Sequence, residues 1–152
     1  MSSALQALLG RERAAIQAYI ELLDKEAKAL GDSDFARLPE LANLKSETAL
    51  RITALEQQRD QEQLALGYAA GRAGAEAACA VGSEELAQTW QDVLLRAEAA
   101  HARNHRNGVM IHTQLEFTRQ TLGFLQASGQ PLYGPDGGHK SSGGGGVSLA
   151  QG

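Results

Sequence analysis

Apolar residues recur every three or four positions along most of this chain of 152 residues, with polar residues between them. That spacing places the apolar side chains on one face of an α-helix. One such stretch covers residues 3–30, and a second begins near Phe35 or Pro39 and ends at about Leu66. A glycine follows each stretch, as is common where a helix ends. The pattern therefore predicts two long helices in the first half of the chain.

The longest pattern lies in the second half of the chain and predicts a third long helix. It opens at Ser83, a good N-capping residue, with two acidic residues after it. Its steps are all of three or four residues, through Leu86, Trp90, Val93, Ala97, His101, Asn104, Gly108, Ile111, Leu115, Thr118, Leu122 and Leu125. We therefore expect an unbroken helix, although glycine at Gly108 costs about 1 kcal/mol relative to alanine. This register places Asn104 and Gly108 on the buried seam and Asn107 at its flank, so that the amide of Asn104 would fix the packing register.

Two segments differ from the long helices in composition. Residues 67–82 contain little but alanine and glycine, which predicts a short helix between flexible joints. Residues 129–152 are rich in glycine and poor in apolar residues, which predicts a disordered tail. We therefore expect an all-α fold with two parts. Residues 1–128 would form an elongated antiparallel bundle or coiled coil of three long helices and one short helix, and residues 129–152 a flexible tail.

Charge and composition narrow the function classes. The chain has 14 basic and 18 acidic residues, a formal net charge of −4, and these are mixed along its length. It has no basic footprint of the kind that binds nucleic acid. No apolar run reaches the length of a membrane span, and the N-terminal residues lack the apolar core of a signal peptide. A single cysteine, Cys79, is consistent with a reducing compartment. We expect a cytoplasmic protein that neither enters a membrane nor binds nucleic acid.

The histidines of the third helix are the first candidates for chemistry. Glu98 and His101 form a Glu-x-x-His pair, as one helix of a di-iron bundle supplies, and His105 follows one turn later. The chain contains no second such pair, so a metal site is disfavoured. A phosphotransfer module of the His-x-x-Lys-Gly type is disfavoured as well, because Gly108 occupies the third position after His105. A metalloprotein or phosphotransfer module centred on His101 and His105 stays an alternative, but we expect no enzyme, no metal and no cofactor.

A second apolar line on the third helix is a candidate for recognition. Met110, Phe117 and Phe124 are spaced by seven residues and lie off the predicted seam. They could line an exposed surface for an amphipathic helix. They could equally belong to the broad buried face that a three-helix bundle needs. The sequence leaves both interpretations open.

The order of several short motifs resembles the FlgN family, the cytoplasmic export chaperones of the flagellar hook–filament junction proteins. The segment LKSETALRITALEQQRDQEQLALG is similar to the family pattern through Lys45, Leu55, Arg59, Leu64 and Gly67. Further on, NHRNGVMI resembles the family's Asn-x-x-Asn-Gly followed by apolar residues. LYGPDG at residues 132–137 is similar to its tyrosine–glycine turn before a variable tail.

This resemblance implies a chaperone that binds the C-terminal helical segments of the junction proteins FlgK and FlgL and delivers them to the export gate. It implies client binding in the C-terminal portion, and Tyr133 matches a tyrosine implicated in docking to the gate protein FlhA. The expected partner-binding residues are Asn104, Asn107, Gly108, Met110, Ile111, Phe117, Phe124, Leu132 and Tyr133. A coiled-coil adaptor of another secretion system would share the same physical features and is a further alternative.

Overall fold

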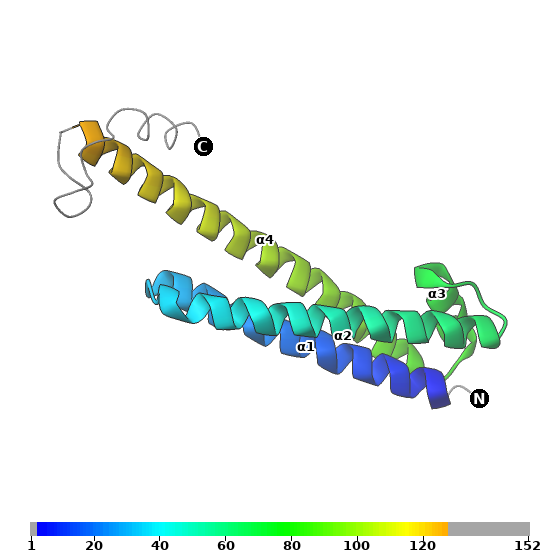
Figure 1. Cartoon of the computed structure of the whole chain (residues 1–152). Coiled ribbons are helices and arrows are strands. Elements are labelled where there is room, and N and C mark those ends of the chain that lie inside the picture. The colour runs from blue at the N-terminus through cyan, green and yellow to red at the C-terminus, as the bar shows by residue number, and fades with distance from the viewer. Residues whose placement is uncertain (1–2, 128–152) are drawn as a thin grey trace. The chain divides into compact units, whose positions relative to one another are not determined.

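The computed structural model describes residues 3–127 and is helical almost throughout (Figure 1). Its elements are α1 (Ser3–Gly31), the short 3-10 helix η1 (Phe35–Arg37), α2 (Leu38–Ala65), α3 (Gly71–Val81) and α4 (Glu84–Ala127). Over the described residues this confirms the all-α fold, the three long helices and the short alanine-rich helix. The chain divides into two compact units, Met1–Asn107 and Gly108–Gly152, with α4 contributing to both. The predicted division at residues 128 and 129 lies at the edge of the described range and stays a prediction.

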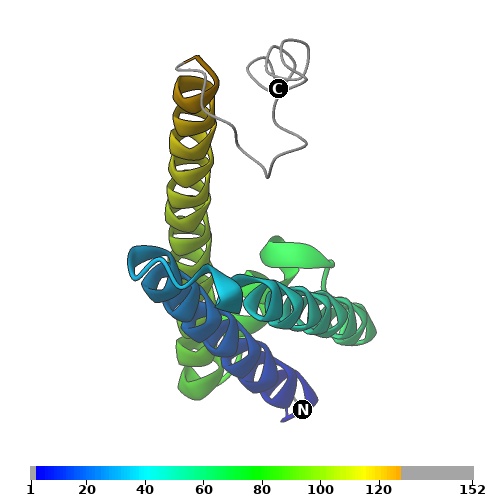
Figure 2. The same ribbon diagram turned by 60° about the vertical axis from the view of Figure 1, so that its left-hand side comes forward.

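In the first unit, α1 and α2 pack antiparallel (Figures 1 and 2). Glu12 near the start of α1 pairs with Arg59 near the end of α2, whereas Glu26 near the end of α1 pairs with Lys45 near the start of α2. The part of α4 in this unit runs parallel to α1. Its contacts with α1 follow the same order along both helices, from Gln6 with Thr89 to the Leu23 carbonyl with Asn107. The three helices therefore form an up-down-up arrangement.

The core of the first unit is built from α1, α3 and α4. Large apolar side chains with little or no exposure fill it, and small side chains of α3 let this helix pack closely against them. A smaller cluster of Leu8, Ala15 and Leu55 lies between α1 and α2. The main cluster consists of Leu5, Leu9, Ile16, Ile20, Leu23, Ala75, Ala78, Cys79, Leu86, Trp90, Val93 and Ala100.

The buried line of α4 differs from the predicted seam. In the first unit it follows a seven-residue spacing through Leu86, Val93, Ala100 and Asn107. The expected seam positions Ala97, His101, Asn104 and Gly108 are exposed instead, so Asn107 rather than Asn104 lies inside. Arg96, three residues after Val93, is half-buried. Arg103, three residues after Ala100, is half-buried as well.

Two arginines explain this difference. Arg96 donates to Gln17 Oε1 at 3.1 Å, and Arg103 lies 3.5 Å from an Asp24 carboxylate oxygen, both on α1. Each arginine is half-buried, and its charged head reaches a polar partner on α1. A pattern that counts arginine as polar skips both positions and places Ala97 and Asn104, the residues directly after them, on the seam.

The connection from α2 to α4 closes one end of the bundle. Gly67 has a φ of +94°, which allows the chain to turn out of α2. The fully buried Gln63 amide then donates to the carbonyls of Ala69 (2.7 Å) and Gly71 (3.0 Å), fixing the approach to α3. At the start of α4, the Ser83 hydroxyl accepts a hydrogen bond from Leu86 N, which confirms the predicted N-cap.

Gly74 on α3 should be the least replaceable glycine of this closure. A Cβ at this position would overlap the Ala69 carbonyl oxygen and lie 2.8 Å from the Gln63 amide nitrogen. We expect Gly74→Ala to lower the free energy of unfolding by about 1–3 kcal/mol, as overpacking does in a tight core. The measurement is urea unfolding followed by circular dichroism.

The matched control is Gly10→Ala in the interior of α1, where a Cβ meets nothing within 4 Å. It should leave stability unchanged or raise it by up to about 1 kcal/mol, because alanine is the better helix former. Equal effects of the two substitutions would contradict the close approach of α3.

Candidate partner-binding site

A buried ion pair joins α1 to α2 near the α3 end of the bundle. Arg59 donates through Nε to Glu12 Oε1 at 2.8 Å and through Nη1 to Gln63 Oε1 at 3.1 Å. Its guanidinium also lies 5.1 Å from the ring centroid of Trp90 on α4, within the range of a cation–π contact. One side chain of α2 therefore holds α1, α4 and the start of the α3 connection together.

Burial changes the titration of this site. Removal from water raises the pKa of the Glu12 carboxyl above its ordinary value of 4.5, and the attraction of Arg59 opposes this only in part. The nearby charges of Glu56 and Asp60 also raise this pKa. Burial raises the pKa of the Cys79 thiol as well, so this cysteine is not set up as a thiolate nucleophile.

A second polar cluster lies around Asn107, at the end of the first unit. Lys45 Nζ bridges the Glu26 carboxylate (3.0 and 3.3 Å) and Asn104 Oδ1 (3.0 Å). The Asn107 amide donates to the Leu23 carbonyl at 2.8 Å and to Glu26 Oε1 at 2.9 Å, and Asn107 is only 1% exposed. The cluster therefore fixes where α4 lies along α1 and α2.

The second unit, described by itself, carries an exposed apolar surface on the last turns of α4. Met110, Phe117 and Phe124, which we call the phenylalanine row, occupy positions seven residues apart. Phe117 is 66% and Phe124 71% exposed, and Met110 is half-buried. Of the two interpretations that the sequence left open, the described side chains of Phe117 and Phe124 favour an exposed surface.

A second line, which we call the leucine row, consists of Ile111, Leu115 and Leu122. Ile111 is 42% and Leu115 47% exposed, and Leu122 is half-buried. At 3.6 residues per turn, this row lies about 120–160° around the helix from the phenylalanine row. Gln114, Thr118, Thr121 and the half-buried Leu125 lie between the two rows.

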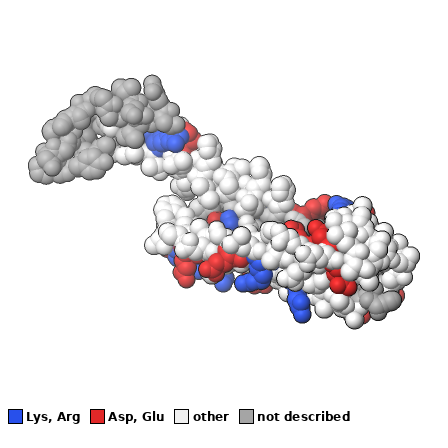
Figure 3. Space-filling model, turned by 45° about the vertical axis from the view of Figure 1, so that its right-hand side comes forward, with Lys and Arg blue, Asp and Glu red and all other residues white. Residues whose placement is uncertain are grey.

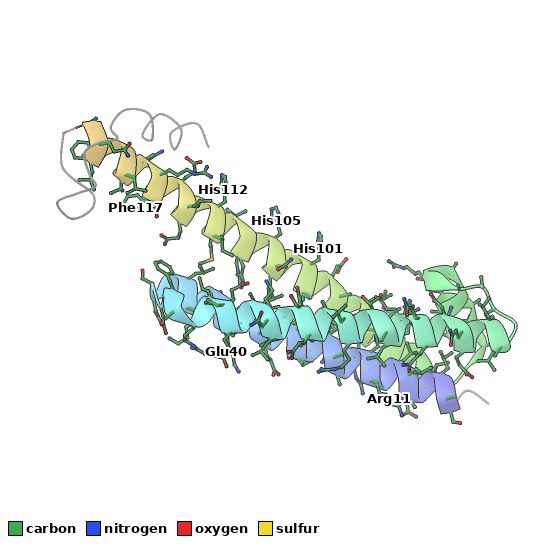
Figure 4. The ribbon with its side chains drawn as sticks, viewed as in Figure 1. Arg11, Glu40, His101, His105, His112 and Phe117 are labelled. Carbon is green, nitrogen blue, oxygen red and sulfur yellow. The ribbon has the colours of Figure 1, made fainter. Side chains whose placement is uncertain are left out.

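The charged and titratable side chains lie elsewhere on α4. Figure 4 shows His101, His105 and His112 along one side of the helix and Phe117 on the other. All three histidines are exposed. On the face drawn in Figure 3, acidic and basic side chains are interspersed over the first unit without forming a patch of one sign. The phenylalanine row therefore lies on a different side of α4 from these three histidines.

The groupings that other functions would need are not found in residues 3–127. No three or more His, Cys, Asp or Glu side chains among them come together as a metal ion would require. Within the same range, no helix has the length and apolar character needed to cross a membrane.

The expected partner-binding residues that the structure describes fall into two groups. Asn104 and Asn107 bind the bundle itself, and Asn107 is enclosed there. Gly108, Met110, Ile111, Phe117 and Phe124 lie on the second half of α4, while Leu132 and Tyr133 lie outside the described residues.

Sequence reasoning missed several of the residues that matter here. Leu115 was assigned to the seam but is exposed, and Glu12 and Glu26 interrupt the apolar pattern of α1 yet are buried in ion pairs. A signal for these pairs was present in the sequence. Two acids fourteen residues apart on one predicted helix match two bases fourteen residues apart on the next, Lys45 and Arg59.

Comparison with known proteins identifies one family. The family model described as FlgN protein matches residues 1–141. Two curated relatives, both named flagella synthesis protein FlgN and both from Yersinia enterocolitica, are 42% identical over 53 residues. The matched segment covers 34% of this chain and 36% of each relative. No solved structure matches the chain.

Asn107 should contribute more to stability than its neighbour Asn104. Asn107→Ala removes two buried hydrogen bonds, to the Leu23 carbonyl and to Glu26, so we expect a loss of about 1–3 kcal/mol in the free energy of unfolding. Asn104→Ala removes a contact at an exposed site and should cost less than about 1 kcal/mol. The measurement is urea unfolding of both variants, and the reverse order would contradict the observed register of α4.

Glu12 should make stability fall as pH rises above about 4.5. Because its pKa is raised on folding, the folded chain holds a proton that the unfolded chain releases between 4.5 and the raised pKa. The difference in unfolding free energy between wild type and Glu12→Gln should therefore be constant below this window and decline through it. Urea unfolding of both proteins across this pH range measures the difference. A rising difference would mean that the attraction of Arg59 outweighs burial.

Proposed function

Because the chain belongs to the FlgN family, we propose that it is an export chaperone of the bacterial flagellum. We propose further that its clients are the C-terminal helical segments of the junction proteins FlgK and FlgL. The observation that carries the proposal is the apolar surface on the second half of α4. Soluble proteins seldom leave several large apolar side chains exposed together unless a partner covers them.

The chemistry of this surface fits an amphipathic helix as client. Its exposed residues are apolar and repeat at helical spacing, so a client can cover them with side chains at matching intervals. Burial of apolar area drives such binding and uses no nucleotide. While bound, the client's own apolar face is covered, which prevents it from assembling early.

Delivery to the export gate completes the proposed role in the cytoplasm. Tyr133, beyond the described residues, matches the tyrosine that the family resemblance connects with FlhA. Client binding through α4 and gate docking through Tyr133 would use different side chains. The two activities can therefore be tested separately.

Client binding should depend on the phenylalanine row without affecting the fold. Phe117→Ala and Phe124→Asp remove exposed apolar contacts, so each should weaken binding of FlgK and FlgL by about tenfold or more. Helix content and melting temperature should stay close to those of wild type. The measurements are pull-down and calorimetric titration with the two clients, together with thermal unfolding.

Val109→Ser is the matched control, because Val109 is exposed on the same helix segment but lies in neither row. It should bind both clients as wild type does. Unfolding of the bundle by Phe117→Ala or Phe124→Asp would show that the row belongs to a core. Failure of the wild-type chain to bind either client would refute the proposed function.

A further inference from the structure

The second half of α4, residues 108–127, has little burial to hold it in the helical state. All the buried residues of α4 lie in its first half, and the last of them is Asn107. From Gly108 to Ala127 every residue is exposed or half-buried. In folded proteins most of the stability of a helix comes from burying one of its faces. This half of α4 must therefore depend on its own tendency to form a helix.

The composition of residues 108–127 gives only a weak tendency of this kind. Two of these 20 residues are glycine and five are β-branched, and both types disfavour the helix relative to alanine. The 24 residues from 84 to 107 contain two β-branched residues and no glycine. The helix is therefore intrinsically weaker in its second half. The residues concerned are Gly108, Val109, Ile111, Thr113, Thr118, Thr121 and Gly123.

The side-chain interactions within this half of the helix do not offset its composition. The hydroxyls of Thr118 and Thr121 donate to the carbonyls four residues earlier, at 3.0 and 2.9 Å, a contact that slightly destabilises helices and often bends them. Arg119 lies 3.4 Å from a Glu116 carboxylate oxygen, but both side chains are well exposed, so this ion pair stabilises the helix little. The last turn has no basic residue to interact with the helix dipole.

From these observations we propose that residues 108–127 are only partly helical in the free chaperone and become fully helical when the client binds. This inference rests on the proposed function and specifies how its binding surface forms. Phe117 and Phe124 lie on one side of the chain only when the backbone between them makes two helical turns. The client therefore meets a continuous phenylalanine row only after this segment has folded. The apparent affinity is reduced by the fraction of free chains that are helical, which favours release of the client after delivery.

Hydrogen exchange of the full chain, alone and with the C-terminal segment of FlgK, tests the proposal directly. Without client, the backbone amides of residues 108–127 should be protected by less than about tenfold, whereas those of residues 84–107 should be protected as strongly as the bundle core. With client, protection of residues 108–127 should rise by about a hundredfold or more. Equal protection of the two halves in the free chain would overturn the proposal.

Gly123→Ala provides a second and quantitative test. A Cβ at Gly123 meets nothing within 4 Å, and this position lies on the same side of the helix as His112, away from both apolar rows. The added methyl group therefore changes helix propensity without adding a client contact. We expect the affinity for the FlgK segment, measured by calorimetric titration, to rise about three- to fivefold, because alanine favours the helical state by about that factor.

The matched control is Gly10→Ala in α1, where a Cβ also meets nothing within 4 Å. It should leave the affinity for the FlgK segment unchanged. Unchanged affinity of Gly123→Ala would mean that the segment is already helical in the free chain and would overturn the proposal, as would an equal gain from Gly10→Ala. If the FlgK segment does not bind wild type at all, the proposed function itself fails. Binding of the client to a segment that is already protected refutes only the coupled folding.

Discussion

The arrangement of the first unit depends on two buried carboxylates of α1 that each need a cation from α2. Glu12 and Glu26 are fourteen residues apart, as are Lys45 and Arg59, so both pairs form only in one antiparallel register. A buried ion pair adds little net stability compared with an apolar pair, but breaking one strands a charge and costs about 3–5 kcal/mol. A slip by one turn would break both pairs together. The ion pairs therefore act mainly by excluding other registers.

Lys45 and Arg59 also fix the position of α4 along α2. Arg59 reaches Trp90, and Lys45 reaches Asn104, so α4 is placed along α2 at two heights. Asn107 adds a third point by donating to the Leu23 carbonyl and to Glu26, which already pairs with Lys45. The energy of a polar group in a low-dielectric interior depends strongly on its position, because each hydrogen bond left unmade there is costly. These polar contacts fix the position of the first half of α4. The second half of the helix instead exposes several large apolar side chains.

The sequence predicted the number, type and approximate bounds of the helices, because helical spacing and glycine stops are local signals. It failed where a long polar side chain takes a buried position. Lys45 lies closer to the interior than its neighbour Leu44, Gln63 is buried while its neighbour Leu64 is exposed, and Arg96 takes the place expected for Ala97. Each of these buried or half-buried polar residues has a partner on another helix: Lys45 on α1, Gln63 on α3 and Arg96 on α1. Single-sequence periodicity contains no information on such partners.

The candidate site shows a second limit of prediction from residue spacing. Apolar residues at seven-residue spacing predicted Met110, Phe117 and Phe124 as a set, but spacing alone gives core and binding surface the same pattern. Only the exposure of the side chains separates the two. For the same reason Leu115, assigned to the seam, proved to be exposed.

An exposed apolar surface creates a risk of self-association, and the residue pattern of α4 reduces it. Gln114, Thr118 and Thr121 are polar residues between the two rows, so the surface is apolar there only at Leu125. The hydroxyl of Thr121 donates to the Phe117 carbonyl, and that of Thr118 to the Gln114 carbonyl, so both are satisfied within the helix. Since hydrophobic free energy grows with buried area, a client that covers more of this surface is favoured over chance association.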